Sequence, residues 1–95
     1  MQVKSLSSSK GNKVPNQFEI ETPEGIYFQS YKTVIAFRNL LGEVTLDKDA
    51  WNYSTTTSRY RNLFLGATTQ EVKARIKSGK YKLADLNDGR AVTRQ

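Results

Sequence analysis

Apolar and polar residues alternate over residues 18–22 and again over residues 26–31, and a period of two is typical of half-buried β-strands. The two stretches flank Pro23-Glu24-Gly25, in which proline presets the turn and glycine tolerates a positive φ. The pattern therefore predicts a β-hairpin over residues 18–31. In this hairpin Ile26 and Phe28 share one face, and the intervening residues share the other.

Four further stretches favour extended structure. Residues 3–6 predict a short first strand, and the β-branched, apolar residues 33–37 suit a central strand. Residues 43–47 predict the next strand, with Val44 and Leu46 pointing inward, and residues 81–84 predict a last strand that returns to the sheet. Residues 7–15 are rich in Ser, Gly, Asn and Lys and predict a mobile loop, whereas residues 87–95 predict a frayed tail.

The period changes after Trp51. Residues 54–58 are all Ser or Thr and offer helix N-caps. Tyr60, Leu63 and Phe64 follow at helical spacing as the expected core contacts, and Gly66 marks the expected helix end.

A second helix is predicted directly afterwards. Thr68 and Glu71 have the spacing of a capping box. Val72 and Ile76 share one helix face, and Gly79 marks the end.

These elements predict a single α+β domain over residues 1–95. We expect an antiparallel sheet of four to five strands, with two short helices packed on one face.

Composition narrows the chemistry. The chain has neither Cys nor His, which excludes thiol catalysis, His-based acid–base catalysis and most structural zinc sites. Glu19 and Glu21 are neighbours on one strand face rather than carboxylates across a cleft. Asp47-Lys48-Asp49 lacks the Gly and Glu of a calcium loop and is better interpreted as a turn with an Asx cap. We therefore predict no enzymatic activity, no cofactor and no metal.

Charge and hydropathy bear on partners. The net charge of +6 favours an acidic partner, either nucleic acid or an acidic protein face, although excess lysine for solubility is an equal alternative. The longest apolar run, residues 34–37, is far shorter than a membrane helix, and no signal-peptide pattern follows Met1. We therefore expect a soluble protein with no membrane partner and no small-molecule substrate.

Basic residues alternate with aromatic residues in a manner typical of single-stranded nucleic-acid binding, in which bases stack on rings and cations meet phosphates. We predict stacking by two exposed tyrosines and phosphate contacts by flanking cations. The predicted nucleic-acid-binding residues are Tyr27, Tyr31, Lys32, Arg59, Arg61, Lys80 and Lys82, with Lys4, Lys10 and Lys13 as further phosphate contacts.

Each of these aromatic positions has a structural alternative. Tyr60 and Tyr81 are spaced as core contacts, and Tyr27 and Tyr31 would be unavailable if helices covered their face. Trp51 is a candidate interface anchor, but a lone Trp in a small domain is more often part of the core.

Residues 51–66, WNYSTTTSRYRNLFLG, resemble a motif of small, uncharacterised proteins of tailed bacteriophages, in which a Tyr-Ser-x-Thr-Thr-x-basic-Tyr core leads into Asn-x-Phe-Leu-Gly. Parts of residues 16–31 and 76–81 are similar to the same family. The resemblance implies a phage protein acting in the host bacterial cytoplasm and implies no catalytic residues. The chain departs from the motif at Leu63, where the resemblance leads us to expect a polar residue.

Two functional hypotheses remain. The first is a basic module that binds nucleic acid. The second is a phage-encoded inhibitor that binds a host protein of the defence or transcription machinery.

Overall fold

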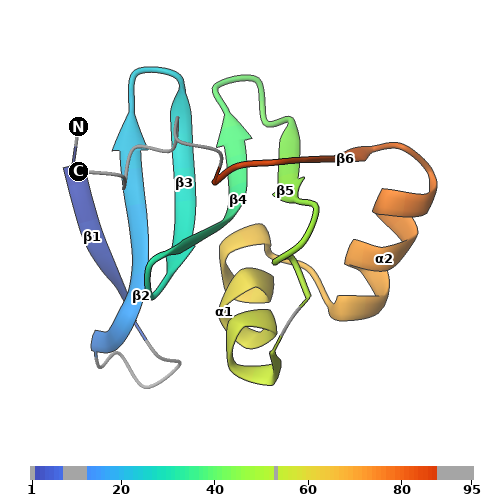
Figure 1. Ribbon diagram of the computed structural model, residues 1–95. Helices are drawn as coiled ribbons and strands as arrows, with labels where there is room; N and C mark the ends of the chain where they lie inside the picture. Colours follow the sequence, from blue (N-terminus) through green and yellow to red (C-terminus); the bar gives the residue numbers. More distant parts are fainter. Residues whose placement is uncertain (1, 8–12, 53, 88–95) are drawn as a thin grey trace.

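The computed structural model describes residues 2–7, 13–52 and 54–87 (Figure 1). Two helices follow the first five strands and precede the sixth. The strands are β1 (Gln2–Ser7), β2 (Lys13–Thr22), β3 (Gly25–Ser30), β4 (Thr33–Asn39), β5 (Val44–Asp47) and β6 (Tyr81–Ala84), and the helices are α1 (Thr55–Leu65) and α2 (Thr69–Lys77). The predicted α+β class is confirmed.

The strands form one sheet in the order β1-β2-β3-β4-β5-β6. The first five are antiparallel neighbours, while β6 pairs with β5 in parallel. A parallel neighbour needs a crossover connection, and here the two helices provide it. The sheet therefore has six strands rather than the expected four to five, and it is mixed rather than wholly antiparallel.

Cross-strand register assigns side chains to the two sheet faces. Phe28 pairs with Ala36, which pairs with Leu46, so these three residues share a face. Tyr27 pairs with Phe37 on the opposite face. The predicted placement of Phe28 and Tyr27 on opposite faces of the sheet is confirmed.

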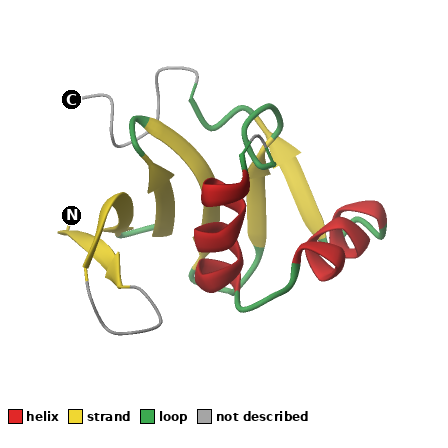
Figure 2. Cartoon of the chain, turned by 90° about the horizontal axis from the view of Figure 1, so that it is seen from below, coloured by secondary structure: helices red, strands yellow, loops and turns green. Residues whose placement is uncertain are grey.

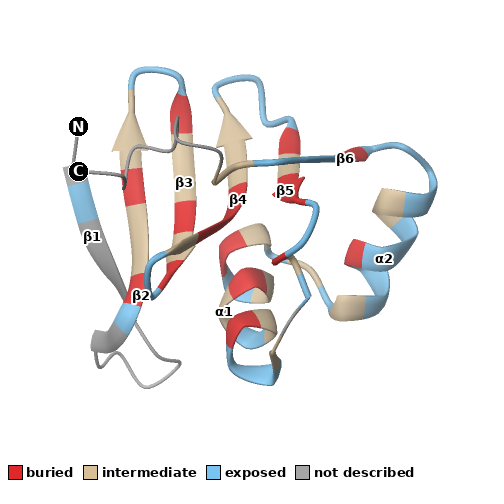
Figure 3. Ribbon diagram, in the orientation of Figure 1, coloured by how far each residue is buried: buried red, intermediate tan, exposed pale blue. Residues whose placement is uncertain are grey.

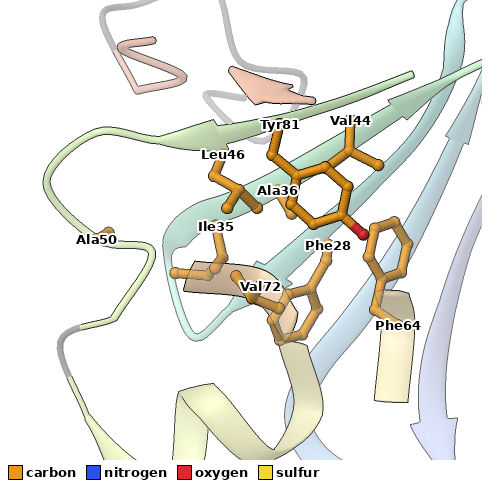
Figure 4. Packing of buried hydrophobic residues seen from close by; sticks show 9 residues of the cluster. All are labelled: Phe28, Ile35, Ala36, Val44, Leu46, Ala50, Phe64, Val72 and Tyr81. Carbon is orange, nitrogen blue, oxygen red and sulfur yellow. The ribbon is translucent and has the colours of Figure 1, made fainter. Parts of the chain in front are cut away.

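The hydrophobic core lies between the face that carries Phe28 and the two helices (Figures 2 and 4). The Phe64 ring of α1 stacks on Phe28 at a centroid distance of 5.8 Å. Arg38 of β4 donates from Nη1 to the Phe64 carbonyl oxygen at 2.9 Å, and Val72 anchors α2 in the same cluster. The cluster consists of Phe28, Ile35, Ala36, Val44, Leu46, Ala50, Phe64, Val72 and Tyr81.

The helix ends follow the sequence signals. Ser54 caps α1, because its side chain accepts a hydrogen bond from the Thr57 amide, and Gly66 ends the helix in the left-handed region at φ 66°. The capping box of α2 is complete, and the hydrogen bond from the Thr68 amide lowers the pKa of Glu71. Both caps confirm predictions made from short-range sequence patterns.

Three predicted boundaries were wrong. The strand after Gly25 ends at Ser30, and Tyr31 adopts φ 57° in a turn, so it does not continue the pleat. Strand β2 begins at Lys13, within the stretch predicted as a loop; residues 8–12 and 88–95 lie outside the described residues. Asn87 was expected to fray, yet its side chain bonds both the amide and the carbonyl oxygen of Val34.

The predicted buried face of α1 was also partly wrong. Phe64 is buried as expected, but Leu63 is 53% exposed. The buried residues are Thr57, Arg61 and Phe64, at i, i+4 and i+7.

Glycine is required at position 25 because the backbone of Arg38 lies too close to leave room for a side chain. This close approach gives a test of the β2–β3 turn. A Cβ at Gly25 would lie 2.2 Å from the Arg38 carbonyl oxygen, and its φ of +152° is one that L-residues rarely adopt. We expect Gly25→Ala to lower the free energy of unfolding by on the order of 3 kcal/mol in urea denaturation. Gly42→Ala is the matched control: its φ is +86° but no atom lies within 4 Å. The control should cost only about 1 kcal/mol, and equal losses would contradict the proposed clash.

Candidate nucleic-acid interface

The predicted cationic residues lie in different environments. Lys32, Arg59, Lys80 and Lys82 are exposed, whereas Arg61 is fully buried. The side chains of Lys4, Lys10 and Lys13 lie outside the described part of the chain. The structure therefore brings only part of the predicted set to the surface.

Arg61 uses its guanidinium inside the protein. Nη1 donates to the Trp51 carbonyl oxygen at 2.6 Å and to Asn52 Oδ1 at 3.3 Å. Nε and Nη2 donate to Asn62 Oδ1 at 3.2 and 2.9 Å, and Nη2 also donates to Thr69 Oγ1 at 3.1 Å. Every one of these acceptors is uncharged.

Burial lowers the pKa of Arg61, but from so high a starting value that the group stays protonated at neutral pH. Its charge also lies over the Trp51 ring, 5.5 Å from the centroid. Because the side chain is buried and its donors are engaged, the prediction that Arg61 contacts phosphate is wrong. We call Arg61, Trp51, Asn52, Asn62 and Thr69 the Arg61 clamp.

Trp51 is itself half-buried and packs against the hydrophobic core. Its carbonyl oxygen accepts the shortest hydrogen bond of the Arg61 clamp. Trp51 thus contributes to the packing of the domain, while its role as an interface anchor stays a prediction.

The two predicted stacking tyrosines do not form a row. The Tyr27 ring lies 4.5 Å from the Phe37 ring on the sheet face opposite the helices, and both side chains are half-buried. Burial raises the pKa of Tyr27, and the nearby Glu24 carboxylate raises it further. Tyr31 is 57% exposed but lies in the β3–β4 turn, where Gln29 Nε2 donates to its carbonyl oxygen.

Lys32 and Arg59 belong to neighbouring segments. Ser30 and Thr57 share a hydrogen bond of 3.1 Å between their hydroxyl oxygens, which places the β3–β4 turn beside the first turn of α1. Arg59 follows the buried Thr57 by two residues, or about 200° around the helix, and therefore points away from the sheet.

Cations are denser along the segment that comprises most of α2, β6 and the turn between them. Residues 72–84 contain five cations and no carboxylate. Four of the five are exposed lysines, two of which had not been predicted as site residues. We call Lys73, Lys77, Lys80 and Lys82 the α2–β6 basic cluster.

The fifth cation fixes the arrangement of the cluster. Arg75 Nη1 donates to the Tyr81 hydroxyl at 2.8 Å, and its charge lies 5.5 Å from the centroid of the Tyr81 ring. This hydrogen bond raises the pKa of Arg75. Tyr81 is only 7% exposed and pairs with Val44 of β5, so the core alternative for this tyrosine is confirmed. Helix α2 and strand β6 are thus joined through the side chains of Arg75 and Tyr81.

Other chemistry is sparse in the described residues. Asp47 caps its turn as predicted, because Oδ2 accepts from the amides of Asp49 and Ala50 at 3.1 and 2.9 Å. Within residues 2–7, 13–52 and 54–87, no group of three or more Asp or Glu side chains is placed to hold a metal ion. The same residues include no helix that is long and apolar enough to cross a membrane.

Comparison with known families matches residues 1–80 to DUF8033, a family of unknown function, and the chain belongs to that family. No curated protein and no solved structure matches the chain. The matched residues include both helices and end one residue before β6.

The Arg61 clamp can be tested by a substitution that keeps the charge. Arg61→Lys retains a cation but loses the planar fork that reaches five acceptor contacts. We expect a loss of about 3 kcal/mol in the free energy of unfolding, measured by urea denaturation. Arg59→Lys, two residues away and exposed, should change it by less than about 0.5 kcal/mol. A small, equal effect of both substitutions would show that the clamp contributes little to stability.

Proposed function

We propose that this protein is a non-enzymatic phage accessory protein that binds nucleic acid through the α2–β6 basic cluster, in the host bacterial cytoplasm. The observation that carries the proposal is the run of five cations without a carboxylate over residues 72–84, four of them exposed. The phage motif over residues 51–66 supports the proposed origin and compartment. Membership of DUF8033 adds no activity.

The electrostatics of the cluster favour a polyanion. Lys73 and Lys77 are four residues apart on α2, and like charges at this spacing cost a helix a few tenths of a kcal/mol. A phosphate backbone would replace this repulsion by attraction and would release its own condensed counterions, which is the main driving force of non-specific binding. The Arg75–Tyr81 contact contributes by holding helix and strand together before any ligand arrives.

A competing explanation exists for Lys82 on β6 and for Lys80, which directly precedes that strand. Strand β6 is an edge of the sheet, and lysines on an edge strand discourage pairing with other chains. That role accounts for Lys80 and Lys82 but not for Lys73 and Lys77, which lie on the helix. Nucleic-acid binding accounts for all four lysines.

The salt dependence of nucleic-acid binding distinguishes a specific site for the phosphates from a general effect of the net charge. We compare Lys77→Gln/Lys80→Gln/Lys82→Gln with Lys32→Gln/Lys48→Gln/Arg59→Gln, because each triple replaces three exposed cations and lowers the net charge from +6 to +3. Binding of fluorescent oligonucleotides is measured by anisotropy across a range of salt concentrations. We expect the first triple to lower the slope of log K against log salt by about 2 to 3, and the second to lower it by less than about 1.

The outcomes are distinct. Equal slopes for the two triples would overturn the α2–β6 basic cluster as the binding site and restore the alternative of Lys32 and Arg59. Absence of salt-dependent binding by the unmodified protein would overturn the function itself. Both triples keep Arg61, so neither disturbs the buried clamp.

A further inference from the structure

The large apolar side chains with the highest exposed fractions among the described residues lie outside the hydrophobic core, in the β4–β5 turn. Leu41 is 85% exposed and Leu40 is 78% exposed, the highest values among large apolar residues in the part of the chain that the structure describes. The turn projects at the upper edge of the sheet in Figure 1, and Figure 3 shows it as exposed. Neither leucine contributes to the core cluster.

The turn is held rigidly by its backbone and by one side chain. Asn39 Oδ1 accepts from the amides of Leu41 and Glu43, both at 2.9 Å, and Asn39 Nδ2 donates to Glu43 Oε1 at 2.8 Å. The Asn39 amide donates to the Glu43 carbonyl oxygen, and Gly42 donates back to the Asn39 carbonyl oxygen. The backbone that carries the two leucines is therefore held by hydrogen bonds, whereas the leucine side chains have no packing contacts in the core cluster. A preformed apolar projection of this kind loses little conformational entropy on binding.

The charge around the leucines differs from that of the whole chain. Glu43 is exposed within the turn, and Glu24 is exposed in the neighbouring β2–β3 turn, which lies alongside because Gly25 pairs with Asn39. Residues 39–43 and 23–25 contain no cation. On the other side, Lys80 precedes Tyr81, the partner of Val44, so the basic cluster begins there. We call Leu40 and Leu41, with Glu24 and Glu43 beside them, the leucine tip.

Two possible occupants are disfavoured by this arrangement. A lipid surface would have to accept two carboxylates beside the inserted leucines, and anionic lipid would repel them. A second copy that met this one tip to tip would oppose two convex surfaces and four carboxylates.

We infer that the leucine tip is a docking site for another protein, whose surface offers an apolar pocket with a cationic group at its rim. The leucines would act as the buried anchors, and Glu24 and Glu43 would meet the cation and set the orientation. This surface is separate from the α2–β6 basic cluster, and the inference does not depend on nucleic-acid binding.

The test begins with photocrosslinking in bacterial cells that express the protein. Leu41 is replaced by p-benzoyl-L-phenylalanine, and Leu63, which is 53% exposed on α1, receives the same replacement as a matched control. We expect a discrete adduct with another protein from position 41 and none from position 63. No adduct at position 41, or an adduct with a second copy of this chain, would overturn the inference.

Binding of the purified partner then decides whether the tip carries the affinity. We expect Leu40→Ser/Leu41→Ser to weaken binding by at least about 30-fold, because two buried leucine anchors are lost. Glu24→Lys/Glu43→Lys should weaken it by about 10-fold through repulsion at the rim, while Leu63→Ser should change it by less than about twofold. Thermal melting confirms that each variant is folded. Unchanged affinity in the leucine variant, or flotation of the unmodified protein with anionic vesicles that the variant loses, would overturn the proposed occupant.

Discussion

A positive charge buried without a carboxylate partner constrains the arrangement of the helices. Removing a guanidinium from water is costly, and Arg61 recovers that cost only because carbonyl, amide and hydroxyl oxygens surround it at hydrogen-bonding distance. Those oxygens come from the β5–α1 connection, from α1 itself and from Thr69 in the first turn of α2. If any of the three segments moved, a donor of a buried charge would be left without an acceptor. The clamp therefore fixes the relative positions of these segments more strictly than apolar packing alone would.

This constraint extends to the candidate binding surface. Once Thr69 is held by Arg61, α2 has a defined starting point, and Val72 and the Arg75–Tyr81 contact fix its remaining turns against β6. The positions of the four exposed lysines follow from that path. Four residues of the Arg61 clamp, Trp51, Asn52, Arg61 and Asn62, lie within residues 51–66. That segment therefore supplies most of the contacts that position α1 and α2.

Predictions from short sequence patterns are confirmed for structures whose contacts are between residues close together in the sequence. The hairpin at Gly25, both helix caps and the Asp47 turn depend on residues within four positions of one another, and all are confirmed. The burial of Arg61 depends on Thr69 and on the backbone at Trp51, and no spacing rule signals a cation whose acceptors are uncharged. The basic cluster was only half predicted for a similar reason. Lys80 and Lys82 flank a tyrosine, but the helix lysines resemble the solvent face of any amphipathic helix until α2 is packed against β6.

The geometry of β5 relates the two proposed surfaces to each other. This strand follows the leucine tip directly, and its first residue, Val44, pairs with Tyr81 between Lys80 and Lys82. A protein held at the tip and a nucleic acid held at the cluster would therefore sit on one rigid pair of strands, with no flexible linker between them. Fixed juxtaposition of this kind raises the effective concentration of one ligand near the other without any catalytic group. A small domain that lacks Cys and His can serve such an adaptor role, because it requires only a stable arrangement of charge and apolar surface.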